Sequence, residues 1–533
     1  MNPGKHILAI DLGTSGCKCA VVSLDGRVVH WAFEPVELKI VGHSGAEQDP
    51  ADWWQAFLLA ASSVVGRASR DELEFAAVCA STQGEGTLPV DKAGNPLANA
   101  LTWLDMRGAD ALSRAAGSGL VNVSGYNPAR LARWIRLTGG APALSGKDQA
   151  GHMLFIKENR PEIYEKTHCF LGVPDYLNFR LTGRMAASRD SILTSWVTDN
   201  RDPSNITSHD GRIGMLGVDR DKLPDIVDCT DTVGALLPDV AAAIGLEASL
   251  PVIAGSIDTS AAAVGSGAVE DGDVHLYIGT SSWLGAHVPA KKTAILSQIA
   301  AVPCAIGDRY LMTALQSAAG SNLAFLRDKV FFSQDALSTG ETPPEIYRVF
   351  DELASDVPAG ARGLMYTPWL FGERCPVDDG NLRAAFLNLS MQHDRADMVR
   401  AAMVGVALNT NWALQAARKF LAGYAVERIT VIGGGGASDT WCQVLADVMN
   451  VTVRQPEAPI QSNVLGSAFI AAAGLGELAF GDVPSLVRYQ KEYHPNPANR
   501  QTYDELAGRF ADAYKTLAPF YRRLRTNNGD TRT

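Results

Sequence analysis

The chain has 533 residues, of which 46% are hydrophobic and 20% are charged, the balance of an ordinary globular protein. This length exceeds what one hydrophobic core normally organises, so at least two domains are expected. The 58 acidic residues outnumber the 47 basic ones, which gives a net charge of −11 at pH 7. This excess of negative charge argues against a nucleic acid or an anionic membrane as the main partner.

The first residues and the apolar segments indicate a cytoplasmic protein without a membrane segment. The stretch 1–6 carries no basic and apolar signal sequence, and no window approaches the ~18 apolar residues of a membrane span. The eight cysteines are scattered without a Cys-x-x-Cys pair. This pattern is typical of reduced thiols, outside a disulfide framework or a zinc site.

Short apolar strands and amphipathic helices alternate along the chain. In the first half, a helix is predicted over 49–65, where Asp49 and Pro50 suit a helix start. The strands predicted beside it cover 7–11, 17–23, 28–33 and 75–81. Such alternation favours an α/β protein with helices on the faces of a layered sheet.

A second set of elements begins near the middle of the chain. A strand over 251–254 leads to Asp258 and a helix over 259–265, and strands follow over 274–278 and 283–288. The turn Gly279-Thr280-Ser281 repeats Gly13-Thr14-Ser15, about half the chain length later. We therefore predict a duplicated fold with domains over 1–252 and 253–533.

Two common nucleotide-binding loops are excluded by their spacing. Gly146-Lys147 lacks the earlier glycine of a Walker A loop, and Asp148 follows it. In the run 433–436, Ser438 occupies the place of the third glycine of G-x-G-x-x-G. The two glycine hairpins remain as phosphate-binding candidates, because their turns expose N–H and hydroxyl groups. Each hairpin taken alone is more often an ordinary turn.

Three further features carry candidate chemistry. Asp11 ends the first strand, where its carboxylate could hold Mg²⁺ through water. Asp258 lies between a strand and a helix of small residues, as either a helix N-cap or a general base for a substrate hydroxyl. The glycines of 433–436 join a strand over 428–432 to a helix over 439–448, as a flexible loop or a site of ligand approach.

In their order and spacing, these motifs resemble the FGGY carbohydrate kinases, and within that family the xylulokinases. The resemblance extends over residues 7–476. The motifs that carry it are 11–18, Glu47-Gln48-Asp49-Pro50 with Trp53-Trp54, Gln83-Gly84-Glu85-Gly86 with Trp103-Leu104-Asp105-Met106-Arg107, 174–183, Asp258, Gly279-Thr280-Ser281, Gly372-Glu373-Arg374-Cys375-Pro376, 433–436 and Leu465-Gly466-Ser467-Ala468.

The resemblance implies two actin/hexokinase-like (ribonuclease H-like) ATPase domains of an α/β protein, with the active site in the cleft between them. It implies ATP-dependent phosphorylation of a sugar hydroxyl with Mg²⁺, most simply that of D-xylulose, and it allows a homodimer. The sugar site and the first hairpin would lie in 1–252, and the catalytic aspartate, the second hairpin and the adenosine site in 253–533.

The resemblance also assigns roles to individual residues. Asp258 would be the catalytic base and would contact the sugar, and Asp11 would hold the metal. The implied ligands of ATP and its phosphates are Gly13, Thr14, Ser15, Lys18, Gly279, Thr280, Gly434, Gly435 and Gly436. The implied ligands of the sugar are Gln83, Glu85, Asp105 and Arg107.

Departures from the family pattern leave the acceptor open. Gly84-Glu85 stands where xylulokinases commonly carry Met-His, and His152 stands where a lysine is expected. The stretch 129–147, rich in Arg and Gly, looks like an insertion near the sugar. L-Xylulose, ribulose, erythritol and glycerol are therefore alternative acceptors. An actin-fold ATPase switch and a sugar-sensing pseudokinase are more distant alternatives, disfavoured by Asp258 and the motif 372–376.

Overall fold

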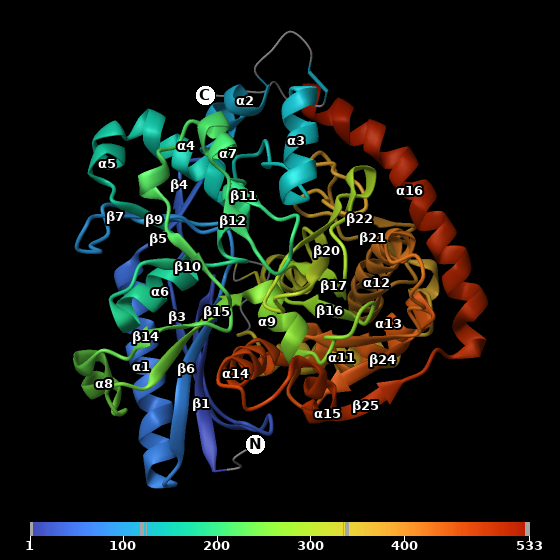
Figure 1. The fold of residues 1–533 in the computed structure, drawn as a ribbon. Helices are drawn as coiled ribbons and strands as arrows, with labels where there is room; N and C mark the ends of the chain where they lie inside the picture. Colours follow the sequence, from blue (N-terminus) through green and yellow to red (C-terminus); the bar gives the residue numbers. More distant parts are fainter. Residues whose placement is uncertain (1–3, 118–121, 124, 334, 336–340, 528–533) are drawn as a thin grey trace.

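The computed structural model describes residues 4–117, 122–123, 125–333, 335 and 341–527. They form two lobes, each built around one large mixed sheet (Figure 1). The sheet of the first lobe has the strand order β14 (Thr232–Ala235), β15 (Pro251–Ile257), β6 (Glu74–Thr82), β1 (Lys5–Gly13), β2 (Gly16–Ser23) and β3 (Val28–Pro35).

Both faces of this first sheet are covered by helices. Leu8 and Ile10 of β1 belong to the core that it forms with α1 (Pro50–Arg70), whereas Ile7 and Ala9 belong to the core that it forms with α14 (Ser462–Gly474). This is the period of two that a strand requires when both of its faces are buried. As predicted, Asp49 caps α1, because its side chain accepts a hydrogen bond from Ala51 N over 2.9 Å.

The second sheet follows the same plan. Its strand order is β18 (Thr293–Ala294), β19 (Ile299–Pro303), β20 (Tyr310–Gln316), β17 (Ser282–Val288), β16 (Val274–Ile278), β23 (Arg428–Ile432), β24 (Thr452–Pro456) and β25 (Tyr489–Tyr493). One face packs on α12 (Arg395–Phe420) and α13 (Asp439–Met449). On the other face, Trp283 and Ile432 pack against Ala262 of α9 (Asp258–Gly265).

The two sheets share one topology. In the first, the hairpin β1–β2 continues antiparallel into β3, while β6 and β15 add in parallel beyond β1. In the second, β16–β17 continues antiparallel into β20, while β23 and β24 add in parallel beyond β16. This repeated order is the ribonuclease H-like arrangement, so the predicted duplicated α/β fold is confirmed.

The remaining elements surround these two sheets. The small sheets pair β4 (Lys39–Val41) with β5 (Gly45–Gln48) and β8 (Ala100–Leu101), β7 (Leu88–Val90) with β9 (Cys169–Leu171), β10 (Ala186–Ser188) with β13 (Asp225–Val227), β11 (Thr198–Asp199) with β12 (Thr207–Ser208), and β21 (Met365–Thr367) with β22 (Ala385–Leu387). The other helices are α2 (Ala109–Gly117), α3 (Pro128–Thr138), α4 (Gln149–Asn159), α5 (Pro161–Lys166), α6 (Val173–Thr182), α7 (Asp210–Leu216), α8 (Pro238–Ile244), α10 (Gly320–Phe325), α11 (Ile346–Ser355), α15 (Val483–Leu486) and α16 (Arg500–Asn527). Within the described ranges, no helix combines the length and the apolar character needed to cross a membrane.

Helices α9 and α14 lie side by side where the lobes meet (Figure 1). A Cβ on Gly466 would lie 1.9 Å from the Ala261 carbonyl oxygen, and one on Gly265 would lie 1.8 Å from the Ser462 carbonyl oxygen. The two backbones therefore approach more closely than any larger residue would allow. The predicted domain division at 252–253 lies within β15, and the division itself stays a prediction.

The segment that the sequence marks as an insertion contains α3, and the end of this helix contacts the second lobe. Lys291 Nζ donates a hydrogen bond to the Ile135 carbonyl oxygen over 3.0 Å and another to that of Arg136. The Thr293 hydroxyl donates to the carbonyl oxygen of Gly139. The last carbonyls of a helix lack intrahelical partners, so these contacts both cap α3 and join the two lobes.

Candidate active site

The predicted metal-binding and catalytic residues, and the loop that carries predicted sugar ligands, lie at one edge of the first sheet. Strands β1, β6 and β15 run parallel, with Asp11 opposite Ser81 and Ile257 opposite Thr82. The carboxyl ends of parallel strands meet at the same edge. As a result, Asp11, the loop after Thr82 and Asp258 are brought together from distant parts of the sequence.

Asp258 occupies the first turn of α9, between β15 of the first sheet and β17 of the second. Burial, followed by the negative charge of Asp11, raises the pKa of Asp258 to about 7, and the charge of Glu85 adds to this rise. Asp11 and Glu85 therefore lie within electrostatic reach of Asp258. A carboxyl group with a pKa near neutrality is suited to accept a proton from a bound hydroxyl.

Several contacts fix the backbone that presents Asp258. Asp190 Oδ2 accepts a hydrogen bond from Ile257 N over 3.2 Å, and Asn178 Nδ2 donates to the Ala254 carbonyl oxygen over 2.7 Å. Gly255 has φ +69°, and a Cβ there would lie 1.9 Å from the Ala80 carbonyl oxygen. The irregular pairing between β15 and β6 at this point sets the direction in which α9 begins.

The turn of the first hairpin is hydrogen-bonded through Thr14 to the loop that follows Thr82. The Thr14 hydroxyl donates to Gln83 Oε1 over 2.9 Å and accepts from Trp103 Nε1 over 2.9 Å. Gln48 Nε2 donates to the Thr14 carbonyl oxygen over 2.8 Å, and Gln83 Nε2 donates to Gln48 Oε1 over 2.7 Å. A hydroxyl has one hydrogen, so that of Thr14 has none left for a phosphate. A phosphate at this turn would bind backbone N–H groups instead.

Asp11 and Lys18 pair across the same hairpin. Asp11 Oδ1 accepts from Ser81 Oγ over 3.1 Å and from Asn463 Nδ2 over 3.3 Å. Lys18 Nζ lies 3.8 Å from Asp11 Oδ2 and donates to the Ile460 carbonyl oxygen over 2.7 Å. Both side chains thus contact the segment around α14.

The surroundings of Asp11 fit a magnesium ion that is held mainly by the phosphates of a bound nucleotide. In the described part of the chain, no group of three or more His, Cys, Asp or Glu side chains is arranged to hold a metal. Mg²⁺ in phosphoryl-transfer sites keeps several waters and takes one or two carboxylates together with substrate phosphates. Asp11 supplies one such carboxylate at the phosphate hairpin.

The second hairpin turn is supported by a segment that sequence reasoning missed. Gly320 N donates to the Gly279 carbonyl oxygen over 2.8 Å, and Ser321 N donates to that of Thr280 over 3.1 Å. Among the described residues, Ser321 Oγ is buried without a hydrogen-bond partner. The only sequence signal is the run Ala319-Gly320-Ser321-Asn322 at the start of α10. This hydroxyl is a further candidate for contact with a polar ligand.

The four glycines after β23 do not all face the same surroundings. A Cβ on Gly435 would lie 2.4 Å from Ile278 Cγ2, and one on Gly436 would lie 2.6 Å from the Val431 carbonyl oxygen. A Cβ on Gly434 would meet no atom within 4 Å. The run therefore packs against the strand that leads into Gly279, and Gly434 is the member that borders open space.

Asp105 and Arg107, two of the predicted sugar ligands, form an ion pair with each other. Arg107 Nη2 lies 2.6 Å from Asp105 Oδ2 and 2.6 Å from Glu47 Oε1, and Asp105 Oδ2 also accepts from Ala46 N over 2.9 Å. These bonds fix the loop that follows β8 against β5. The assignment of Asp105 and Arg107 to sugar contacts stays a prediction.

Glu85 stands in a different environment. It has φ +63°, and a Cβ on the preceding Gly84 would lie 3.5 Å from Ile257 Cδ1, next to Asp258. Burial raises the pKa of Glu85, and the positive charges of Arg374 and Lys147 oppose this rise. A carboxylate accepts hydrogen bonds from sugar hydroxyls, which is the chemistry that the predicted role of Glu85 requires.

His152 is the other residue that departs from the family pattern. Unlike Glu85, it makes contacts through both nitrogens of its ring. Its Nδ1 lies 3.0 Å from Thr87 Oγ1 and its Nε2 lies 3.2 Å from the Asp105 carbonyl oxygen. Burial lowers the pKa of His152 to about 4. The His152 side chain is therefore neutral near pH 7, and it holds together the segments that carry Thr87 and Asp105.

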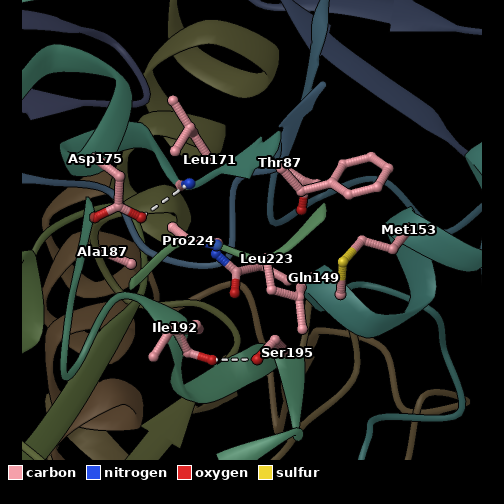
Figure 2. Close-up of a pocket in the computed structure, with 12 residues that line it drawn as sticks. Thr87, Gln149, Met153, Leu171, Asp175, Ala187, Ile192, Ser195, Leu223 and Pro224 are labelled. Atoms are coloured by element: carbon pink, nitrogen blue, oxygen red, sulfur yellow. Dashed lines mark hydrogen bonds between the residues drawn. The ribbon is translucent and has the colours of Figure 1, made fainter. Parts of the chain in front are cut away.

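The first lobe also contains a small cavity, which lies between α4, α6 and the strand β9 (Figure 2). Asp175 at its wall accepts a hydrogen bond from Gly172 N over 3.0 Å and others from the Ser191 hydroxyl, and burial raises the pKa of Asp175 to about 7. None of the predicted site residues lines this cavity. It is a packing feature of the lobe, apart from the edge that carries Asp258.

Comparison with known proteins agrees with this geometry. Models of the N-terminal and C-terminal domains of the FGGY family of carbohydrate kinases match residues 6–265 and 274–475. A xylulose kinase from Bacillus subtilis is 28% identical over 99% of this chain and 98% of its own length. A gluconokinase from Bacillus licheniformis is 23% identical over 97% of each chain. The crystal structure of a xylulose kinase from Rhodospirillum rubrum matches with a TM-score of 0.81 at 26% identity, over 97% of this chain and 100% of that one.

The two family models together cover most of the chain, in the order in which the two lobes occur. They confirm the family predicted from the motifs, and with it an ATP-using enzyme that phosphorylates a sugar. Two duplicated sheets, two glycine hairpins and an aspartate between them thus have a common explanation: the chain belongs to the FGGY family of carbohydrate kinases.

Proposed function

We propose that this kinase transfers the γ-phosphoryl group of Mg·ATP to the terminal hydroxyl of D-xylulose, giving D-xylulose 5-phosphate. The observation that carries the proposal is the convergence of Asp258, Asp11 and Glu85 at one sheet edge, beside the first hairpin turn. The similarity to xylulose kinases over nearly the whole chain supports D-xylulose as the acceptor.

In this proposal, Asp258 accepts the proton of the attacking hydroxyl. Its pKa of about 7 lets a substantial fraction be ionised near neutral pH. The transition state of phosphoryl transfer is loose, so positioning and charge neutralisation contribute more than the strength of the base. Asp190 and Gly255, which fix the backbone around Asp258, therefore matter for the rate without touching the sugar.

The phosphates would be held by backbone N–H groups of Gly13, Thr14, Ser15, Gly279 and Thr280, with Lys18 nearby as a cation. Gly434, Gly435 and Gly436 would form the turn beside the adenosine, with Gly434 bordering the ligand. Asp11 would hold Mg²⁺, which when bound neutralises the charge that develops on the β- and γ-phosphates. Gln83, which bonds to both Thr14 and Gln48, would link this region to the sugar.

D-Gluconate is the second candidate acceptor, because gluconokinases align over nearly the whole chain as well. Coupled measurement of ADP release from Mg·ATP tests both. The panel comprises D-xylulose, L-xylulose, D- and L-ribulose, D-gluconate, glycerol and erythritol. Selective turnover of D-xylulose, lost in Asp258→Asn, supports the proposal. Selective turnover of another acceptor contradicts it and leaves the kinase assignment intact. A homodimer, which the family resemblance allows, is tested by sedimentation velocity.

A further inference from the structure

A short segment of the second lobe, residues 317–321, lies directly against the turn of the second hairpin. It follows β20 and ends in the first turn of α10. Gly320 N donates to the Gly279 carbonyl oxygen over 2.8 Å, and Ser321 N donates to that of Thr280 over 3.1 Å. A Cβ on Gly320 would lie 2.4 Å from the Gly279 carbonyl oxygen, so a larger residue would prevent this approach. We call 317–321 the support segment.

The hydrogen bonds from the support segment fix the direction of two peptide groups in the turn. The Gly279 carbonyl and the Thr280 N–H belong to one peptide group, and the Thr280 carbonyl and the Ser281 N–H belong to the next. Both peptide bonds are trans, so in each group the C=O and the N–H point in opposite directions. Because both carbonyl oxygens face the support segment, both N–H groups point away from it. The proposed function places phosphate oxygens at this turn, and N–H groups with fixed directions are suited to bind them.

Glu373 holds the other end of the support segment. Its Oε1 accepts from Ser317 N over 3.0 Å and from Arg374 N over 2.8 Å. Its Oε2 accepts from Asn409 Nδ2. The exposed fractions of Glu373 and Asn409 are 2% and 1%. These hydrogen bonds therefore form away from water, where a donor without an acceptor is costly.

Glu373 and Asn409 are each anchored by their own surroundings. Asn409 lies within α12, and its Oδ1 accepts from Trp369 Nε1 over 3.1 Å. The backbone of Glu373 exchanges two hydrogen bonds with that of Asp379, over 3.1 and 2.9 Å. In contrast, residues 317–319 of the support segment belong to no helix or strand. The support segment is therefore the part that would shift if its contact with Glu373 were mismatched.

We propose that Glu373 is a positioning residue for the nucleotide phosphates: together with Asn409, it holds the support segment against Gly279 and Thr280 and so sets the direction of the N–H groups that meet the phosphates. The motif 372–376 thereby contributes to nucleotide binding without contacting the nucleotide. This inference rests on the proposed function in one respect, the placing of phosphates at the second hairpin. It does not depend on the identity of the sugar.

Glu373→Gln tests the hydrogen-bond pattern at nearly constant size. The new NH₂ group would face the NH₂ group of Asn409, and rotation of the Asn409 amide would only turn that group towards the Trp369 indole N–H. One buried donor is thus left without an acceptor, a cost that corresponds to a roughly 5- to 150-fold change in an equilibrium constant. We expect Mg·ADP to bind more weakly by a factor in this range, and adenosine, which has no phosphate, to bind as in the wild type.

Isothermal titration measures the affinity for Mg·ADP, and displacement of Mg·ADP measures that for adenosine. In steady-state kinetics, the KM for ATP should rise with the dissociation constant of Mg·ADP, while the KM for the sugar changes less. A role of Glu373 in stability alone would not produce this difference between ADP and adenosine, or between the two KM values.

The reciprocal exchange tests whether the pattern can be restored. Asn409→Asp alone places a second carboxylate against Glu373 and is expected to weaken Mg·ADP binding as well. In the double variant Glu373→Gln/Asn409→Asp, the glutamine amide can donate to the new carboxylate, whose other oxygen accepts from Trp369 Nε1. Every donor then has an acceptor again, so most of the lost affinity should return. If Glu373→Gln alone fails to fold, the comparison of Asn409→Asp with the double variant carries the test.

Asp447→Asn is the matched control for the loss of a buried carboxylate in the same lobe. Asp447 lies near the end of α13 and accepts from Gln443 Nε2 over 2.8 Å, from Asn496 N over 2.8 Å and from Asn499 Nδ2 over 2.7 Å. This control should lower the unfolding temperature and leave the affinity for Mg·ADP unchanged. Lys18→Met, in the first hairpin, is the reference for a direct phosphate contact and should weaken Mg·ADP binding.

Glu373→Gln that binds Mg·ADP like the wild type would overturn the positioning role, and so would a double variant that binds as weakly as the single ones. If neither Lys18→Met nor Glu373→Gln affected Mg·ADP more than adenosine, the placing of the phosphates would fall, and the positioning role with it. The binding measurements contain no sugar. Selective turnover of an acceptor other than D-xylulose would therefore overturn the proposed acceptor alone.

Discussion

The Thr14 hydroxyl donates its hydrogen to Gln83 Oε1 over 2.9 Å, and this bond joins the phosphate hairpin to the loop that carries Glu85. The same oxygen accepts from Trp103 Nε1. A residue that the sequence assigns to the nucleotide thus supports the acceptor side through its side chain. The predicted phosphate and sugar sites therefore belong to one hydrogen-bonded network, so a change at one site is expected to affect the other.

Thr14→Val tests this connection. The variant keeps the backbone N–H but leaves Gln83 and Trp103 each short of one partner, a loss of about 1–3 kcal/mol for a buried group. We expect the KM for the sugar to rise roughly 5- to 150-fold, and the KM for ATP to change less. Initial-rate kinetics over both substrates measure this, with Thr14→Ser as the control that keeps the hydroxyl. A rise confined to the KM for ATP would contradict the assignment.

Asp258→Asn is expected to remove turnover while leaving the fold intact. General-base catalysis contributes roughly 10²- to 10⁴-fold, and the amide cannot accept the proton of the attacking hydroxyl. The kcat should fall by that factor, while nucleotide affinity from isothermal titration and the unfolding temperature stay close to those of the wild type. Asp210→Asn, at an exposed carboxylate in α7, serves as the control. Undiminished turnover in Asp258→Asn would show that another group accepts the proton.

The pH dependence of the reaction follows from the raised pKa of Asp258. Burial and the charges of Asp11, Glu85 and Asp190 raise it to about 7, so Asp258, the proposed base, is mostly protonated at lower pH. We expect kcat/KM for the sugar to increase with pH and to level off above about 7. Asp190→Asn removes one of the negative charges, so this increase should move to lower pH. A profile that is flat between pH 5.5 and 8 would argue against Asp258 as the titrating base.

Gly434 and Gly435 are neighbours in the glycine turn with different surroundings, so alanine substitutions at the two positions form a matched test. Gly434→Ala adds a methyl group into open space, whereas Gly435→Ala places it 2.4 Å from Ile278 Cγ2. We expect Gly434→Ala to raise the KM for ATP with an unchanged unfolding temperature. Gly435→Ala should lower the unfolding temperature, in keeping with about 1–3 kcal/mol for overpacking. Thermal unfolding and ATP kinetics on both variants check this, and equal stabilities would show that the turn can relax.

Much of the fold could be predicted from local pattern. The hairpins around Gly13 and Gly279 repeat, and the strands predicted over 7–11 and 251–254 lead to the candidate residues Asp11 and Asp258. The helix predicted over 259–265 is α9, and the glycine run does follow a strand. These features depend on residues close together in the sequence, which is where periodicity and turn chemistry are informative.

What could not be predicted depends on contacts between distant segments. No local pattern shows that the Thr14 hydroxyl is used by Gln83, or that Arg107 is paired with Glu47. Each of these facts follows from tertiary packing, which sequence spacing does not encode.

The packing of α14 on the first sheet has a consequence for how the protein is made. Ser467 Oγ in this helix donates to the Ile10 carbonyl oxygen over 3.3 Å, across 457 residues of chain. Domains generally fold in turn as the ribosome delivers them, yet Ile7, Ala9 and Val22 gain their cover only when this helix emerges. Until then, this face of the nascent sheet lacks the cover that α14 gives it. The lobe that is synthesised first is therefore completed only by a helix from the last part of the chain.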